Sequence, residues 1–301
     1  MNNVYHIPAL LSETIDGLSV VENGVYVDLT FGGGGHAREL LSRLGATGKL
    51  IAFDQDEDAL HNVLDDTRFV FVQSNFRFVK NFLRYHNIDQ VDGILADLGV
   101  SFHHFDEADR GFSFRFEGAL DMRMNTKSAV TAAHIINTYS EAQLADVLYW
   151  FGEIRNARAI ARKICQKRSE KYIDMVEDFI AILKPFFTYE NEKKDLARIF
   201  QALRIEVNGE IEVLKSMLLQ SLEVLKPGGR LAVLTYHSLE DRLVKNFMKT
   251  GNFEGELTKD FYGNILSPFI QITKKPLVAS AQEVINNPRS RSAKLRIVEK
   301  K

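Results

Sequence analysis

Three aspartates that each follow a short apolar run are the side chains of this chain best placed to do chemistry. They are Asp28, Asp54 and Asp97. Short runs rich in β-branched and aromatic residues predict buried strands. In an open α/β sheet the carboxyl ends of the strands border the crevice where ligands bind. The sequence therefore predicts three carboxylates around one ligand, with Phe76 after a further run, Phe69–Val72, at the same edge.

A run of four glycines separates the first of these strands from a predicted helix. Gly32–Gly35 and His36 come just before Ala37–Leu44, which is apolar at helical spacing and is followed by Gly45 as a candidate C-cap. Glycines let the backbone approach a ligand closely, and a helix N-terminus offers free N–H groups. This strand, turn and helix predict a nucleotide-type binding site.

Two ligands fit this turn, and the residues alone leave both open. Gly32, Gly34 and Ala37 match the dinucleotide fingerprint, with alanine in the third position. S-adenosylmethionine (SAM) instead has no phosphate and carries an ammonium and a carboxylate, so it needs an acid as well as N–H donors. Asp28 could be that acid or could merely cap a turn, whereas Asp54 could hold ribose hydroxyls of either ligand.

Alternating strands and helices predict an α/β fold with a parallel sheet. We expect strands at 25–30, 50–54, 69–72, 91–96, 230–236 and 294–298, and helices at 9–18, 37–44, 58–64 and 78–85. His237 follows the strand 230–236, so it is either a site residue or a core or capping histidine. Ser238 after it is expected to be the N-cap of a helix, with an acid at the third position.

Composition is that of an ordinary globular chain. The 301 residues are 45% hydrophobic and 26% charged, and the net charge of −2 means that any binding of nucleic acid must be local. The single cysteine, Cys165, excludes an internal disulfide framework. No membrane-length apolar run and no leader pattern is present, so we expect the cytoplasm. No cluster has metal-ligand spacing, and we expect no metal.

The middle of the chain interrupts the strand–helix alternation. Between residues 100 and 125 no helical period is sustained, and the run Phe112–Phe116 alternates phenylalanine with polar residues. That alternation predicts either a core strand or aromatic faces for stacking bases, and the second alternative would make Phe114 a base contact. Arg110, Arg115 and Arg123 would then contact phosphates.

A helical stretch at 131–202 is predicted to be an insertion. Its segment 155–171 holds seven lysines or arginines against one glutamate, with Arg155, Arg158 and Arg162 on one helical face. Such a face is either simply solvated or bound to a polyanion. Arg204 lies on a helical face with Gln201 and Asn208, and Arg289 and Arg291 near the end of the chain are further candidate phosphate contacts.

Seven sequence blocks, taken in order, closely resemble the bacterial RsmH (MraW) family over essentially the whole chain. These blocks are Asp28–His36, Asp97–Ser101, Arg110–Phe114, Leu120–Met124, Phe200–Ile205, His237–Arg242 and Asn287–Arg289. Members of that family are SAM-dependent methyltransferases that modify N4 of a cytidine in the decoding region of 16S ribosomal RNA. The resemblance implies a class I SAM-dependent methyltransferase (Rossmann-like) sheet with an inserted helical substrate domain.

The resemblance also implies domains, partners and a site. The catalytic domain would comprise residues 1–104 and 203–301, and the RNA-recognition domain 105–202. The implied substrate is 16S rRNA in the small ribosomal subunit. The resemblance leaves open whether the protein forms a homodimer. The implied SAM site comprises Gly34, Gly35, His36, Asp54, Phe76, Asp97 and a position occupied by His104. After Asp-Leu-Gly-Val the family usually has Ser-Ser, one further residue and Gln, where this chain has Ser101-Phe102-His103-His104. The family also usually has Phe in place of Tyr236, so this chain departs from the pattern twice.

The amino nitrogen of cytosine is a weak nucleophile, because its lone pair is delocalised into the ring. Methyl transfer therefore needs an acceptor for the hydrogen of this amino group. Asp97 or the neighbouring backbone carbonyls of Leu98 and Gly99 are predicted to accept it, and His237 is the second catalytic candidate. Two rival functions stay open at this level. One is a nicotinamide-dependent oxidoreductase that uses the same glycine turn, and the other is a non-catalytic RNA-binding factor of ribosome assembly.

Overall fold

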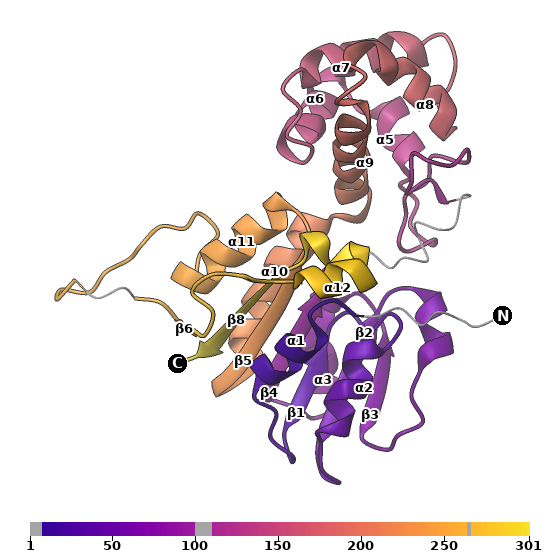
Figure 1. Ribbon diagram of the computed structural model, residues 1–301. Coiled ribbons are helices and arrows are strands. Elements are labelled where there is room, and N and C mark those ends of the chain that lie inside the picture. The colour runs from indigo at the N-terminus through magenta and orange to yellow at the C-terminus, as the bar shows by residue number, and fades with distance from the viewer. Residues whose placement is uncertain (1–7, 100–109, 264–265) are drawn as a thin grey trace. The chain divides into compact units, whose positions relative to one another are not determined.

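The computed structural model describes residues 8–99, 110–263 and 266–301 (Figure 1). The chain divides into two compact units, one made of 1–99 with 212–301 and the other of 100–211. We call the first the sheet unit and the second the helical unit. His104 falls outside the described residues.

The sheet unit is built on one sheet, whose described strands run in the order β3-β2-β1-β4-β5-β8-β6, with β7 also paired to β8. The strands are β1 Val25–Asp28, β2 Lys49–Asp54, β3 Phe69–Gln73, β4 Val91–Asp97, β5 Leu225–Thr235, β6 Phe269–Gln271, β7 Leu277–Val278 and β8 Lys294–Lys300. Strands β1 to β5 pair in parallel, and β8 pairs antiparallel with β5. The order reverses beside β1, so β1 and β4 border the position where such sheets bind ligands.

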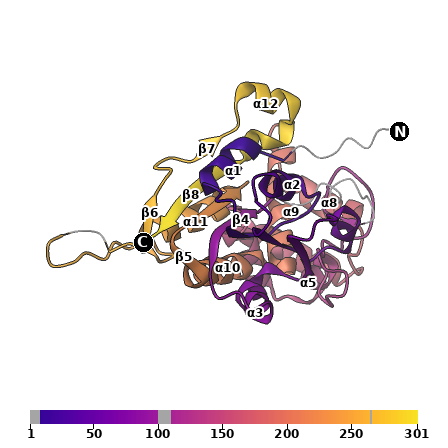
Figure 2. The same ribbon diagram turned by 90° about the horizontal axis from the view of Figure 1, so that it is seen from below.

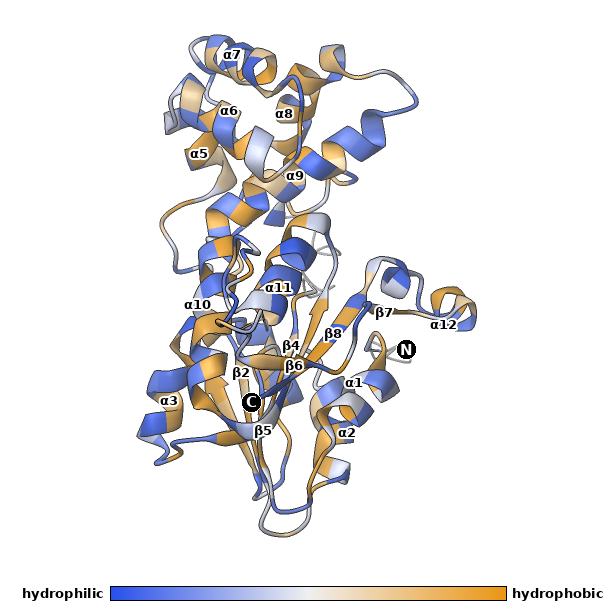
Figure 3. Ribbon diagram, turned by 90° about the vertical axis from the view of Figure 1, so that its left-hand side faces the viewer, coloured by the Kyte–Doolittle hydropathy of each residue, from blue (hydrophilic) through white to orange (hydrophobic). Residues whose placement is uncertain are grey.

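Helices cover both faces of this sheet (Figure 2). On one face α1 (Leu11–Leu18) and α2 (Gly35–Ser42) share a hydrophobic core with the strands. On the other face the core includes residues of α3 (Val79–Tyr85), α10 (Glu210–Val224) and α11 (Ser238–Thr250). Much of the sheet is accordingly hydrophobic (Figure 3), as burial on both faces requires. Short elements complete the unit: η1 Glu57–Asn62, η2 Phe76–Phe78, α12 Ala281–Asn286 and η5 Pro288–Ser292.

The helical unit has a hydrophobic core of its own. Its described helices are α5 Ala132–Thr138, α6 Glu141–Trp150, α7 Ala157–Arg168, α8 Val176–Leu183, η4 Lys184–Phe186 and α9 Glu192–Asn208. Phe200 of α9 packs against Phe179 and Phe114, with ring centroids 6.1 and 5.8 Å apart. Leu203 is also buried in this core, and the helical unit continues to residue 211, beyond the end at 202 that the sequence predicted.

Three local expectations were wrong. Of the two alternatives for the run at 112–116, the core strand is wrong, because no strand forms there. Its phenylalanines also do not share one buried face: Phe112 is buried, Phe114 is half-buried and Phe116 is exposed. The helix after β5 is capped by His237 and not by Ser238, since the His237 side chain accepts from Glu240 N. The helix after the glycines ends at Ser42, with Arg43 and not Gly45 as its C-cap.

Candidate active site

The glycine turn after β1 is held by an acid from the neighbouring strand. Gly32 N donates to Asp54 Oδ2 at 2.8 Å, and Gly32 and Gly34 have φ of +48° and +73°, a region that favours glycine. Gly34 is the N-cap of α2. A Cβ atom would lie 2.9 Å from the Phe31 ring at Gly34 and 2.7 Å from Pro8 at Gly35, so neither position has room for a side chain.

Asp28 is a buried acid with an oxygen that lacks a partner. Its Oδ1 accepts from Thr30 N at 3.0 Å, whereas Oδ2 is buried without a hydrogen-bond partner in the described structure. Burial raises the pKa of Asp28 to about 7, and the carboxylates of Asp97 and Asp54 add to this rise. A buried carboxylate oxygen without a partner is costly, so this site suits a ligand that brings a cation or an N–H donor.

Asp54 has both carboxylate oxygens engaged by the backbone. Besides Gly32 N on Oδ2, Asp56 N donates to Oδ1 at 2.9 Å. Each carboxylate oxygen can accept more than one hydrogen bond, so Asp54 can still bind hydroxyl groups. Its position therefore couples ligand binding to the shape of the glycine turn.

Asp97 ends β4 beside these groups. Its backbone N donates to Thr30 Oγ1 at 2.7 Å, and its Oδ1 accepts from Gly99 N at 3.1 Å. The Tyr236 hydroxyl is also hydrogen-bonded to the Asp97 carboxylate, and burial, together with that carboxylate, raises the pKa of Tyr236. The tyrosine therefore keeps its proton and donates a hydrogen bond, so that the hydroxyl is a second donor to the carboxylate beside Gly99 N.

His36 contributes a neutral imidazole to the same place. Burial lowers its pKa, and its Nε2 lies 3.2 Å from Ala9 O, a group that can only accept. Nε2 therefore carries the proton, which leaves Nδ1 as an acceptor 3.9 Å from Asp97 Oδ2. We call Asp28, His36, Asp54, Asp97 and Tyr236 the strand-end cluster. In the strand-end cluster hydrogen-bond acceptors outnumber hydrogen-bond donors, which suits a ligand rich in N–H and O–H groups.

Phe76 and His237 lie after the carboxyl ends of β3 and β5. Phe76 begins η2 and packs partly against the core, after Asn75, whose Nδ2 donates to Gln55 Oε1 at 2.8 Å. The His237 Nδ1 accepts from Glu240 N at 3.4 Å, and its Nε2 lies 3.1 Å from Glu240 Oε1. Glu240 Oε2 in turn accepts from Tyr236 N at 3.0 Å. His237 thus holds the start of α11, next to Tyr236.

Four of the predicted RNA-contact residues are engaged inside the helical unit. The Arg110 guanidinium donates to Arg123 O at 2.7 Å and lies over the Phe112 ring. Arg123 pairs with Asp121 at 2.6 Å. Arg204 makes two hydrogen bonds to Glu210, of 2.8 and 2.9 Å, and Phe114 packs on Phe200. These contacts organise the unit from within.

The arginines predicted on one helical face have a different environment, and Arg155 precedes α7, so the prediction that it shares the helix with Arg158 and Arg162 was wrong. Arg155 and Arg158 are exposed, and in the described ranges neither makes an ion pair. Arg162 is also exposed, and its Nε lies 3.4 Å from Glu141 Oε1. Arg289 and Arg291, both exposed, lie in η5 of the sheet unit. The structure therefore leaves surface arginines where a polyanion can reach them.

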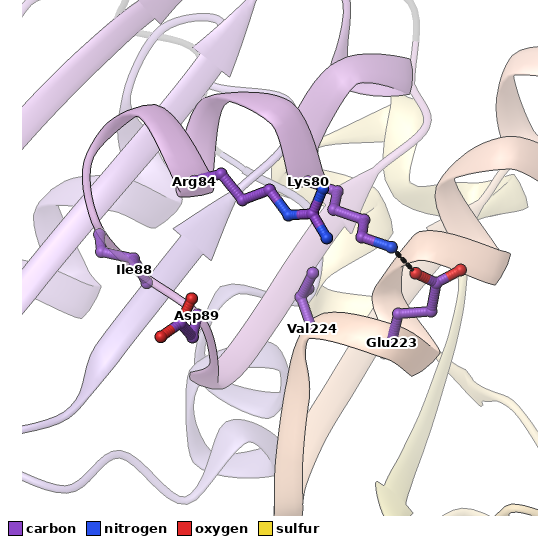
Figure 4. Close-up of a pocket in the computed structure, with 6 residues that line it drawn as sticks. All are labelled: Lys80, Arg84, Ile88, Asp89, Glu223 and Val224. Atoms are coloured by element: carbon purple, nitrogen blue, oxygen red, sulfur yellow. Dashed lines mark hydrogen bonds and ion pairs between the residues drawn. The ribbon is translucent and has the colours of Figure 1, made fainter.

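A cavity of about 240 Å³ lies elsewhere in the sheet unit, between α3 and the end of α10 (Figure 4). It is lined by Lys80, Arg84, Ile88, Asp89, Glu223 and Val224. Lys80 forms an ion pair with Glu223 across it. None of the strand-end cluster lines this cavity, so it is separate from the candidate active site.

Sequence reasoning gave too little weight to two residues of this site. Thr30 ties β1 to β4 through Asp97 N, and Tyr236 contacts the Asp97 carboxylate. Thr30 follows Asp28 by two residues, which is a common spacing for a side chain that closes a turn. Tyr236 stood out only as a departure from the family pattern, and its contact with a residue 139 positions away is visible only in the fold.

Comparison with known proteins gives one consistent result. The model of the MraW methylase family matches residues 3–301. The chain is 59% identical over 297 residues to the ribosomal RNA small subunit methyltransferase H of Bacteroides fragilis, covering 99% of this chain and 98% of that protein. The protein of the same name from Bacteroides thetaiotaomicron gives the same identity and coverage. That from Flavobacterium johnsoniae is 54% identical over 296 residues, with 98% of each chain covered.

These matches span the whole chain and not the glycine turn alone. The family resemblance drawn from the seven blocks is therefore confirmed, and so is the expected α/β methyltransferase fold. The positions of individual site residues stay predictions.

Proposed function

The chain belongs to the MraW methylase family, and from that premise we propose that it methylates N4 of a cytidine in the decoding region of 16S rRNA. It is a SAM-dependent rRNA methyltransferase; the proposal concerns the atom that is methylated and the residues that act. The observation that supports a SAM site most directly is the buried Asp28 Oδ2 without a partner, beside Asp54 and Asp97.

The strand-end cluster fits SAM by charge, because its buried acid Asp28 has an oxygen without a partner. SAM supplies the methyl group on a sulfonium, which is a good leaving group and needs little acid–base help. Asp28 would pair with the ammonium of the methionine end, because its Oδ2 lacks a donor. Asp54 would hold the ribose hydroxyls, and Gly34 and Gly35 would border the ligand from the start of α2.

Asp97 is the proposed acceptor of the N4 hydrogen. An acceptor at this hydrogen favours a pyramidal nitrogen and stabilises the positive charge that develops on it. Gly99 N and the Tyr236 hydroxyl hold the carboxylate in place, so little reorganisation is needed during the reaction. The target cytosine must be unpaired or flipped to reach this acceptor. In the proposal His237 is a positioning residue, because it holds the start of α11 next to Tyr236.

The remaining parts of the proposal concern the partner. The exposed Arg155, Arg158 and Arg162, with Arg289 and Arg291, would contact RNA phosphates. The engaged Arg110, Arg123, Arg204 and Phe114 would support the fold. In this proposal the substrate is the small ribosomal subunit and the reaction takes place in the cytoplasm. No metal ion takes part in the proposed reaction. One site per chain suits either a monomer or a homodimer. No helix in the described part of the chain has the length and apolar character of a membrane span.

One experiment tests the proposal directly. Purified protein is incubated with tritiated SAM and unmethylated small subunits, and the labelled nucleotide is mapped and digested to nucleosides. We expect label in N4-methylcytidine in the decoding region. Label on another base or atom would contradict the proposed position. RNA binding without transfer would favour a non-catalytic assembly factor, and hydride transfer with a nicotinamide cofactor would favour an oxidoreductase.

A further inference from the structure

An aromatic pair at the end of α6 is exposed although its helix is well packed. Tyr149 is 52% exposed and Trp150 64%, and their rings meet edge to face with centroids 5.0 Å apart. Leu144, Val147 and Leu148 of the same helix are buried in the core of the helical unit. The pair lies off this apolar stripe, so core packing does not account for it.

The connection from α6 to α7 is held tightly by its backbone. Glu153 N donates to Tyr149 O at 3.1 Å, and Ile154 N donates to Leu148 O at 3.2 Å. Ile154 is buried, and a Cβ atom at Gly152 would lie 2.8 Å from Leu148 O. The aromatic pair and the residues that begin α7 are therefore presented on one ordered segment.

The two arginines on this segment differ from the cations in the last turn of α7. Lys167 pairs with Glu170, and Arg168 donates to two backbone carbonyls. Arg155 and Arg158 are exposed and have no such partner in the described residues. They stand at the helix start, where the helix dipole disfavours cations, so helix stability does not explain them either.

We propose that Tyr149 and Trp150 form a stacking platform for bases of single-stranded RNA whose phosphates are held by Arg155 and Arg158. Aromatic faces beside arginines bind unpaired nucleotides by stacking and by charge. Between Leu148 and Arg158 the only acid is Glu153, so cations predominate on this segment. A protein partner that covered the aromatic pair would also have to neutralise both arginines, whereas RNA does so with its backbone.

This inference rests on the proposed function, because it extends the contact between the helical unit and the RNA substrate. It assigns the α6–α7 segment to RNA flanking the target nucleotide, without a role in the transfer step. Stacking tolerates any base, so the platform would favour unpaired over duplex RNA and would show little sequence preference.

Trp150 makes the test direct, because it is the only tryptophan in the chain. Tryptophan fluorescence is recorded while the full-length protein is titrated with a 12-nucleotide single-stranded RNA of mixed sequence, and separately with the matching duplex. We expect the single strand to quench the emission and to bind at least several-fold more tightly than the duplex. Absence of quenching, or absence of binding to the single strand, would overturn the inference.

Variants are compared by anisotropy of the same RNA carrying a dye. We expect Trp150→Ala to weaken binding about tenfold, the scale of losing one stacked base, and Trp150→Phe to keep most of the affinity. Replacing both Arg155 and Arg158 by Ala should lower the log–log salt slope by about 1.4, for two lost contacts to a single strand. The control is Tyr189→Ala, which removes an aromatic side chain that is 95% exposed elsewhere in the helical unit.

Equal binding by Trp150→Ala, Tyr189→Ala and unchanged protein would reject the platform, provided that circular dichroism shows intact helices. Methylation of small subunits is assayed in parallel to separate this result from the proposed function. If methylation at N4 persists while Trp150→Ala binds RNA normally, only the platform fails. If no methylation occurs while Trp150 still reports RNA binding, the proposed reaction fails and the platform stands.

Discussion

The strand-end cluster and the surface at the start of α7 use charge in opposite ways. In the cluster, Asp54 and Asp97 are fixed by backbone N–H groups, and Asp28 is buried with a raised pKa. At the start of α7, Arg155 and Arg158 are exposed and without an ion pair among the described residues. Buried charges act over short distances and demand precise partners, whereas exposed charges act through a screened field. Substitutions in the first region should therefore change affinity or rate sharply, and those in the second should change salt dependence.

The largest effect is expected for Asp97→Asn. This change keeps the size and one acceptor oxygen but removes the charge that offsets the developing positive nitrogen. We expect a loss on the order of a hundredfold in single-turnover methylation at saturating SAM and RNA, with a much smaller loss of SAM affinity.

Tyr236→Phe is the matched control for Asp97, because it removes one hydrogen bond to the carboxylate and leaves the charge. Its rate should fall by less than tenfold. An Asp97→Asn enzyme that regains the wild-type rate once SAM saturates would show that Asp97 is a SAM ligand and not the N4 acceptor.

Asp54→Ala should weaken SAM binding by about 1.5–3 kcal/mol, the scale of hydrogen bonds to a charged group. It also removes the acceptor for Gly32 N, so part of this loss will come from a looser glycine turn. Isothermal titration calorimetry measures the affinity, and the melting temperature without SAM reports the turn. Unchanged SAM affinity would remove Asp54 from the site.

Asp28 predicts two pH effects of opposite sign. Because its folded pKa is about 7, Asp28 loses its charge below pH 7. SAM affinity should fall toward tenfold per pH unit there, since the ammonium loses its partner. The folded state without SAM binds more protons than the unfolded chain between about pH 4 and pH 7. Its stability should therefore decline as pH rises through that window, by at most about 4 kcal/mol from this group.

Asp28→Asn isolates both effects. Its SAM affinity should be low and independent of pH between 5.5 and 8. The stability of the wild type relative to this variant, measured by urea unfolding without SAM, should decrease from pH 4 to pH 7 and then stay level. A constant difference would contradict the raised pKa, and a pH-dependent SAM affinity in the variant would assign the titration to another group.

The smallest effect on the chemistry is expected for the arginines in and just before α7. Replacing Arg155, Arg158 and Arg162 by Ala should weaken binding to the small subunit and lower its log–log salt slope by about one unit per lost phosphate contact. SAM affinity and the single-turnover rate at saturating RNA should not move. An unchanged salt slope would show that this helix face is only solvated.

Arg204→Ala is the contrasting variant within the same unit. Arg204 is 12% exposed and hydrogen-bonded twice to Glu210. Removing one partner of this half-buried pair leaves the other without its hydrogen bonds, and the cost is about 1–3 kcal/mol. We expect a lower melting temperature and an unchanged salt slope. The reverse pattern would place Arg204 among the RNA contacts.

Much of the sheet unit could be predicted from local sequence. The apolar runs before Asp28, Asp54 and Asp97 became β1, β2 and β4, because a strand buried on both faces must be apolar along its length. Because these strands are parallel, their carboxyl ends lie at the same edge of the sheet. The sequence therefore also predicted that the three acids would share that edge. The seven sequence blocks, in their order along the whole chain, identified the family.

Only the tertiary structure determined what each charged side chain contacts. Arg110, Arg123, Arg155 and Arg158 are equivalent candidates in the sequence, yet the first two are engaged by the loop around them and the last two are exposed. Tyr236 reaches Asp97 because β4 and β5 are neighbours, although 139 positions separate the two residues. A local pattern records hydrophobicity and spacing, whereas the partner of a charge depends on which distant segments the fold brings beside it.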